Sequence, residues 1–165
     1  VVSQLQKQGI EVYLLSGDRK QVAEKIATEL GIKNYHGEMS PVEKVEFIRQ
    51  LGDKTLMVGD GLNDAAALKT ASVSMSPASA VDITQNAADI VFQGNQLQPV
   101  ITALDTAKFS QKLVQQNFVL AIAYNVIAIP LAVTGYVTPL NAAIAMSSSS
   151  LLVIGNAMRL NRSKF

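Results

Sequence analysis

A long stretch without formal charge constrains the fold of this chain more than any other feature. No Asp, Glu, Lys or Arg occurs among the 46 residues between Lys112 and Arg159. A soluble domain does not need so long an uncharged stretch, because charged side chains cover much of its surface. Residues 113–137 and 140–158 are each close to the roughly 20 residues with which a helix crosses a hydrocarbon layer of about 30 Å. The sequence therefore predicts a transmembrane helical hairpin in a lipid bilayer.

A turn and flanking basic residues predict how this hairpin is oriented. Gly135, Thr138 and Pro139 indicate a tight turn between the two apolar segments. The flanking basic residues are Lys108, Lys112, Arg159, Arg162 and Lys164. By the positive-inside rule, both ends lie in the cytoplasm and the turn faces the other side. The alternative is a very apolar helical pair in a soluble fold, where uninterrupted segments of this length are rare.

Charged residues are concentrated before the uncharged stretch. All 13 acidic residues lie between Glu11 and Asp105. The net charge of +1 gives no reason to expect a nucleic acid as a partner. The absence of cysteine excludes disulfides and thiolate metal sites within this sequence. Because 48% of the residues are hydrophobic, an intrinsically disordered chain is excluded as well.

Residues 1–97 alternate between short apolar runs and runs with helical spacing. We expect strands at residues 11–15, 55–58, 73–75 and 90–92, and helices at residues 22–30, 41–51, 63–71 and 80–87. Ser40, Pro41 and Glu43 predict a capping box at the start of the second helix. Strands separated by helices of this length predict an α/β fold, with a parallel sheet covered by helices on both faces.

These patterns divide the chain into four parts. Residues 1–97 are predicted to form the α/β domain, 98–112 a linker helix, 113–158 the two transmembrane helices and 159–165 a cytoplasmic tail. The first residues have neither an initiator Met nor the layout of a signal peptide. We therefore expect the chain to be an internal piece of a longer protein.

Two turns in the α/β part carry the residues suited to chemistry. Ser16-Gly17-Asp18 follows the first predicted strand, and residues 59–64 (GDGLND) follow the second. Ligands of open α/β sheets bind at these carboxyl ends of strands, and carboxylate and amide oxygens suit Mg²⁺. The Ser16 hydroxyl can donate to a phosphoryl oxygen, and Lys44 can supply positive charge. The pattern predicts a phosphoryl-transfer site, although no Asp in the chain occupies the setting of a nucleophile.

A longer string is more specific than either turn alone. Residues 59–68 read GDGLNDAAAL and resemble the hinge signature of P-type ATPases, and residues 15–18 (LSGD) are similar to a second motif of their phosphorylation domain. Pro41 and Lys44 match the spacing of the Pro and Lys that precede the hinge in this family. The resemblance implies a haloacid dehalogenase-like fold for residues 1–97. Ala66 departs from the family pattern, which has Pro there, and this puts the local rigidity of the helix start in doubt.

The same resemblance implies roles for individual residues. Asp60 would bind Mg²⁺, with Asp64 supporting the site. Ser16, Gly17 and Lys44 would contact the aspartyl-phosphate, and Asn63 would order the site together with Asp64. The residues with an implied catalytic role are Ser16, Gly17, Asp18, Lys44, Asn63 and Asp64.

The membrane half is most similar to the copper-transporting members. They carry a Tyr-Asn pair and a Met-x-x-Ser-Ser pattern in these two spans, and this chain has Tyr124-Asn125 and Met146 followed by Ser147–Ser150. A thioether is a soft ligand suited to Cu(I), and the last span lacks the acidic residue expected of a zinc transporter. The implied Cu(I) contacts are Tyr124, Asn125, Met146, Ser149 and Ser150. The branch linked to cytochrome oxidase assembly is the most similar.

A complete pump of this family needs parts that the chain does not contain. These are the phosphorylated Asp, the nucleotide-binding and actuator domains, the other transmembrane helices and their Cys-containing metal site. The resemblance implies ATP as substrate, Mg²⁺ as cofactor, Cu(I) as the transported ion and a copper chaperone as a further partner. It also implies a multi-pass protein of the plasma membrane, the inner membrane in bacteria. By itself, the chain is expected neither to hydrolyse ATP nor to transport ions.

Other interpretations of the same residues remain open. The chain can be a membrane-anchored, non-catalytic fragment that binds or regulates a partner, or a haloacid dehalogenase-like phosphatase with a membrane tail. The Ser147–Ser150 cluster can serve helix packing alone. His36 is expected in a surface loop without a role. Met39, Met57 and Met75 are expected to be packing residues.

Overall fold

The computed structural model describes residues 1–60, 62–80, 82–94, 96–135 and 137–162 of the chain. Gly61 of the predicted GDGLND turn, Lys164 and the end of the predicted tail lie outside these residues. The chain divides into two compact units, Val1–Ile101 and Thr102–Phe165.

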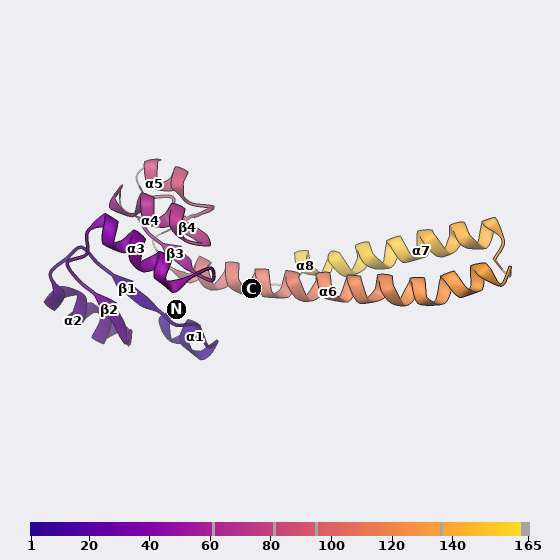
Figure 1. Cartoon of the computed structure of the whole chain (residues 1–165), viewed down its shortest axis with the longest axis horizontal. Coiled ribbons are helices and arrows are strands. Elements are labelled where there is room, and N and C mark those ends of the chain that lie inside the picture. Colours follow the sequence, from indigo (N-terminus) through magenta and orange to yellow (C-terminus); the bar gives the residue numbers. More distant parts are fainter. Residues whose placement is uncertain (61, 81, 95, 136, 163–165) are drawn as a thin grey trace. The chain divides into compact units, whose positions relative to one another are not determined.

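The first unit consists of short strands and helices in alternation (Figure 1). Its helices are α1 (Val2–Lys7), α2 (Lys20–Leu30), α3 (Pro41–Leu51), α4 (Ala65–Thr70) and α5 (Asp82–Ala87). Its strands are β1 (Tyr13–Leu15), β2 (Asn34–His36), β3 (Leu56–Val58), β4 (Val73–Pro77) and β5 (Ile90–Phe92), and a 3-10 turn, η1 (Leu62–Asp64), precedes α4. The predicted α/β alternation is confirmed.

The strands form two parallel sheets where one was predicted. In the first, β1 pairs with β2, with Leu15 opposite His36. In the second, the strand order is β3-β4-β5, with Val58 opposite Met75. The expectation of a single sheet is wrong for the described residues, because β1 and β3 do not pair with each other.

The predicted capping box is present at the start of α3. The Ser40 hydroxyl accepts a hydrogen bond from the Glu43 N–H at 3.3 Å, and the Glu43 carboxylate accepts one from the Ser40 N–H at 2.8 Å. The Ser40 hydroxyl also donates to the Glu43 carboxylate at 2.7 Å, and this bond, together with the one from the Ser40 N–H, holds the pKa of Glu43 below its ordinary value. Pro41 occupies the first turn, where it costs no helical hydrogen bond. This cap stabilises the helix by about 1 kcal/mol and fixes where α3 begins.

The sequence pattern misses α1 and β2. Asn34, Tyr35 and His36 are too polar to show the apolar run of a buried strand, yet they pair along β1. The prediction that His36 lies in a loop is therefore wrong. Its ring is exposed, and its centroid lies 4.6 Å from that of Phe47 on α3.

Small and medium-sized apolar side chains fill the core of the first unit. Ala23 and Ala27 are fully buried one turn apart on α2, and this lets the helix lie close to its neighbours. The larger buried residues include Ile48, Leu68, Met75 and Phe92. Met75 is a packing residue, as predicted.

The second unit is a pair of long apolar helices. It contains α6 (Gln98–Val133), whose first turn belongs to the first unit, together with α7 (Pro139–Ala157) and α8 (Arg159–Arg162). Helices α6 and α7 run side by side in opposite directions (Figure 1). By length and composition, both are able to cross a membrane. Helix α6 continues without a break through the predicted linker and into the first predicted span.

Polar side chains join the two long helices at one end of the pair. The Asn156 amide donates to the Asn117 side-chain oxygen at 2.8 Å. Arg159 donates to the Asn156 side-chain oxygen at 3.0 Å and to that of Gln116 at 3.4 Å. Arg159 was predicted only as a flanking charge. It also contributes to holding the hairpin together.

Candidate functional site

The turn after β1 is held by its own side chains. The Ser16 hydroxyl donates to the Asp18 carboxylate at 3.0 Å and accepts from the Asp18 N–H at 3.1 Å. Ser16 is half-buried, whereas Gly17 and Asp18 are exposed. A Cβ at Gly17 would make only ordinary contact, 3.5 Å from the Met39 carbonyl oxygen. The turn is therefore fixed in shape and open to a ligand.

Backbone hydrogen bonds join this turn to the segment after β2. The Ser16 N–H donates to the His36 carbonyl at 2.9 Å, and the Met39 N–H donates to the Ser16 carbonyl at 3.0 Å. The Glu38 N–H donates to the Asp18 carbonyl at 2.6 Å. The position of Ser16 thus depends on the path of the chain from His36 to Met39.

Lys44 and Asp64 form a buried ion pair. The Lys44 Nζ lies 2.7 Å from the Asp64 Oδ1, and the two side chains are 9% and 15% exposed. Lys44 is placed by the cap of α3, since its N–H donates to the Ser40 carbonyl. Removing two charges from water is costly unless they meet each other closely. The structure thus holds a cation in a fixed place beside the 3-10 turn that follows β3.

Close packing at the end of β3 requires a glycine. A Cβ at Gly59 would lie 2.9 Å from the Cβ of Asp64. Gly59 therefore lets Asp64 approach the end of the strand and reach Lys44. Asp60 and Asn63 are exposed, and within the described residues neither side chain makes an ion pair or a hydrogen bond. The Asp60 carboxylate is available to a ligand.

A continuous series of contacts connects the two predicted turns. Ser16 bonds to Met39, which is followed by the cap residue Ser40, and Lys44 lies one turn further along α3 and pairs with Asp64. Among the described residues, no hydrogen bond or ion pair joins Ser16 or Asp18 to Lys44 or Asp60. The structure brings Ser16 to Asp18 and Lys44 to Asp64 and connects the pairs through the start of α3.

The side chains of this turn fit a magnesium ion that takes few ligands from the protein and the rest from water and phosphate oxygens. The described residues contain no group of three or more His, Cys, Asp or Glu side chains that could hold a metal. Mg²⁺ in phosphoryl-transfer sites commonly takes one or two carboxylates and completes its shell with water and phosphate oxygens. Asp60 offers one open carboxylate of this kind. Asp64 is engaged with Lys44 and is suited to a supporting position.

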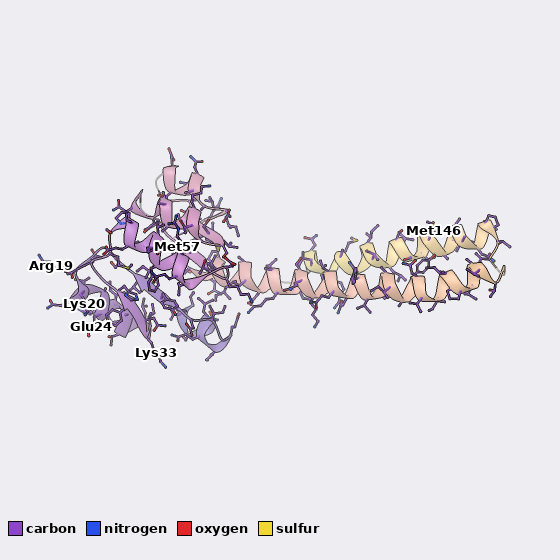
Figure 2. The ribbon with its side chains drawn as sticks, viewed as in Figure 1. Arg19, Lys20, Glu24, Lys33, Met57 and Met146 are labelled. Carbon is purple, nitrogen blue, oxygen red and sulfur yellow. The ribbon has the colours of Figure 1, made fainter. Side chains whose placement is uncertain are left out.

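The predicted membrane residues lie in two different settings. Tyr124 and Ser149 face a cavity of about 270 Å³ between α6 and α7, which is also lined by Leu120, Ala145, Ser148 and Leu152. Met146 is 64% exposed and does not line this cavity; Figure 2 labels it on α7. Asn125 and Ser150 are exposed and donate to carbonyls of their own helices, those of Ala121 and Met146.

Sequence reasoning does not find one polar pair, formed by the buried Ser74 and the exposed Asp89. The Asp89 carboxylate accepts from both the N–H and the hydroxyl of Ser74, at 2.8 Å each. These bonds hold the pKa of Asp89 below its ordinary value, and Lys69 adds a smaller effect. Ser74 is 1% exposed and lies on β4, and Asp89 immediately precedes β5. An Asp before a strand gives no distinguishing signal in the sequence.

Comparison with known proteins agrees with the fold. The family described as haloacid dehalogenase-like hydrolase matches residues 1–72. The nitrogen fixation protein FixI of Rhizobium meliloti (strain 1021) is 50% identical over 98% of this chain and 22% of its own length. The copper-exporting P-type ATPase of Bacillus subtilis (strain 168) is 38% identical over 99% of this chain and 21% of its own length.

A solved structure matches both units. The crystal structure of a zinc-transporting PIB-type ATPase in the E2.Pi state superposes with a TM-score of 0.90 at 29% identity, covering 96% of this chain and 26% of that one. The fold and its turns thus define the first unit as a haloacid dehalogenase-like domain. Over almost its whole length the chain is similar to P-type ATPases that transport metal ions, and it spans about a fifth of the length of the curated relatives it matches.

Proposed function

We propose that this chain is the C-terminal part of a pump that couples ATP hydrolysis to the movement of Cu(I) across a membrane. The observation that carries the proposal is the largely buried Lys44–Asp64 pair, whose Asp64 belongs to the same turn, residues 59–64, as the exposed carboxylate of Asp60. Enzymes catalyse phosphoryl transfer mainly by positioning the reacting groups and stabilising their charge. A fixed cation and an open carboxylate that can bind a metal ion meet this requirement.

In this proposal the γ-phosphoryl group of ATP passes to an Asp carboxylate outside the chain. The bond from the γ-phosphorus to the β,γ-bridging oxygen breaks, a bond to the carboxylate oxygen forms, and ADP leaves. Water later hydrolyses the acyl phosphate and releases inorganic phosphate. The Ser16 hydroxyl, on leaving Asp18, and the Gly17 N–H donate to the phosphoryl oxygens, and Lys44 supplies positive charge. Asp18 and Asp64 keep the turns in shape, and Asn63 orders the site when the phosphoryl group is bound. Asp60 would hold Mg²⁺, which when bound neutralises phosphoryl charge.

The two separate sheets support a contribution from outside this chain. Strand β1 pairs only with β2, and β3 pairs only with β4, within the described residues. Each strand therefore has one edge whose N–H and C=O groups lack a strand partner, and such edges are templates for pairing. A strand that carries the phosphorylated Asp would pair with these edges and bring its carboxylate to the Ser16 and Asp60 turns. By itself, the chain is proposed to be inactive.

The choice of Cu(I) rests on the chemistry of α7. Met146 supplies a soft thioether, whereas α7 has no carboxylate. The exposed Met146 and Ser150 lie four residues apart on one face of α7, suited to an ion path shared with helices outside the chain. Tyr124, Asn125 and Ser149 complete the proposed set. The copper-exporting relative supports this choice, although the solved neighbour transports zinc.

Orientation and partners belong to the same proposal. Lys108, Lys112 and Arg159 lie at the two ends of the uncharged stretch, so both ends lie in the cytoplasm by the positive-inside rule. The first unit and the C-terminus then face the cytoplasm of a bacterial inner membrane. Actuator and nucleotide-binding domains, further spans and a copper chaperone are the proposed partners.

The Asp60→Ala variant of the full-length protein tests this function. Phosphoenzyme formed from radiolabelled ATP is expected to be lost, because the open carboxylate is removed. Asp53→Ala, which removes another exposed carboxylate outside the turn, is the control and is expected to behave as the wild type. Near-normal phosphoenzyme in the Asp60 variant would contradict the proposal.

A further inference from the structure

The segment after β2 controls the shape of the turn that carries Ser16. Three backbone hydrogen bonds join residues 36–39 to residues 16–18. We propose that Gly37 is a positioning residue for the Ser16–Asp18 turn, an inference that rests on the proposed phosphoryl-transfer function. Gly37 itself bears no group that could contact a phosphate, so it acts through Ser16.

The space around Gly37 admits no side chain. A Cβ at this position would lie 2.6 Å from the Lys20 Cα, 3.0 Å from the Lys20 N and 3.1 Å from the Asp18 carbonyl oxygen. All three are backbone atoms, at the end of the turn and at the start of α2, where Figure 2 labels Lys20. Unlike the end of a flexible side chain, they cannot rotate away. Any larger residue must push the two segments apart.

Glycine is required at position 37 because there is no space for a side chain, whereas at position 31 it is required by the backbone conformation. Gly31 has a φ of 69°, and no atom lies within 4 Å of the place that a Cβ would take, so an alanine there is strained by backbone conformation alone. Gly37 is not among the glycines with positive φ. An alanine at Gly31 therefore strains only the local backbone, whereas an alanine at Gly37 displaces the Ser16–Asp18 turn.

Displacement at Gly37 would reach both parts of the site. Glu38 already has a φ of 58°, and its N–H donates to the Asp18 carbonyl, so the segment has little freedom to adjust. Met39 bonds to Ser16 and precedes Ser40, the cap of the helix that carries Lys44. A Cβ at Gly37 thus moves Ser16 relative to Lys44.

The test is competition by inorganic phosphate in the full-length protein. Phosphoenzyme formation from ATP is measured as phosphate is added. In Gly37→Ala we expect phosphate to inhibit about tenfold more weakly, because misplacement of a positioning group by about 1 Å is costly. Half-saturation by ATP is expected to be unchanged, since the nucleotide-binding domain lies elsewhere. A general loss of stability would not change the inhibition by phosphate while leaving the half-saturation by ATP unchanged.

Two controls distinguish the ways in which this inference can fail. Gly31→Ala is expected to leave phosphate inhibition unchanged, and Ser16→Ala is expected to weaken it. Wild-type inhibition in Gly37→Ala, with weakened inhibition in Ser16→Ala, would overturn the positioning role alone. Wild-type inhibition in Ser16→Ala would instead overturn the proposed role of the turn, and the role of Gly37 with it.

A second variant covers the case in which Gly37→Ala does not fold. Glu38→Gly accepts the positive φ without strain and keeps the N–H donor, but it makes the segment more flexible. We expect faster hydrogen exchange at the Met39 amide and weaker inhibition by phosphate. Unchanged phosphate inhibition despite faster exchange would contradict the inference.

Discussion

The Lys44 side chain is only 9% exposed, and its Nζ lies 2.7 Å from the Asp64 Oδ1. Its stability depends on Asp64, because a buried charge without a partner loses its hydration and gains nothing in return. The same contact places positive charge beside the turn that carries Asp60. At the scale of single residues, one ion pair therefore stabilises the first unit and prepares its candidate site.

Lys44→Ala is expected to lower the free energy of unfolding of the first unit by about 3 kcal/mol, because it leaves the Asp64 carboxylate unpaired. Thermal or urea unfolding of the full-length protein, followed in the first unit, measures this loss. The matched control is Lys54→Ala, an exposed lysine without an ion pair among the described residues, with an expected change near zero. Equal stability of the two variants would contradict the role given to the pair.

At the scale of elements, strands β4 and β5 are joined by more than their ladder. Asp89 accepts two hydrogen bonds from Ser74 and returns one through its own N–H at 3.1 Å. These bonds favour the ionised carboxylate, and this is why its pKa is lowered from the ordinary 3.8. The stabilisation is present above pH 3.8 and is lost as the pH falls through the lower pKa of the folded state.

Asp89→Asn is expected to reduce this acid dependence. At neutral pH the variant should unfold at a lower temperature than the wild type, because the ionised acceptor is lost. As the pH falls below 3.8, the difference between the two should shrink. Melting temperatures across this range test the prediction, with Asp53→Asn as the exposed control. A difference that does not change with pH would rule out the ionised carboxylate as its source.

Most elements could be predicted because their signals are local. Ser40, Pro41 and Glu43 determine the start of α3 within four residues, and the cap forms as predicted. Strand β2 could not be predicted, because its polar residues are held by pairing with a distant strand. The division into two sheets was missed for a related reason, since spacing along the chain does not say which strands are neighbours.

Part of the candidate site could be predicted for the same reason. Ser16, Lys44, Asp60 and Asp64 belong to short motifs with a recognisable spacing, and the structure adds that Lys44 pairs with Asp64. The role of Gly37 could not be predicted, because it depends on the approach of Lys20 from another segment. A glycine that is needed for space has no local pattern.

At the scale of the whole molecule, an α/β unit with a candidate phosphoryl-transfer site precedes a helical pair that contains the uncharged stretch between Lys112 and Arg159. Helix α6 begins in the first unit, at Gln98, and continues as the first long apolar helix. The two units are therefore connected by helical backbone and not by a loop. The central claim is that phosphorylation near Asp60 and passage of Cu(I) near Met146 are steps of one cycle.

Metal transport into inverted membrane vesicles tests this claim most directly. With ATP present, the full-length protein is expected to accumulate Cu(I) and to form phosphoenzyme only when Cu(I) is available. Asp60→Ala should abolish both activities, and Met146→Ala should weaken the Cu(I) dependence of both. Accumulation of Zn²⁺ in place of Cu(I) would contradict the account, and so would phosphoenzyme formation that does not depend on Cu(I).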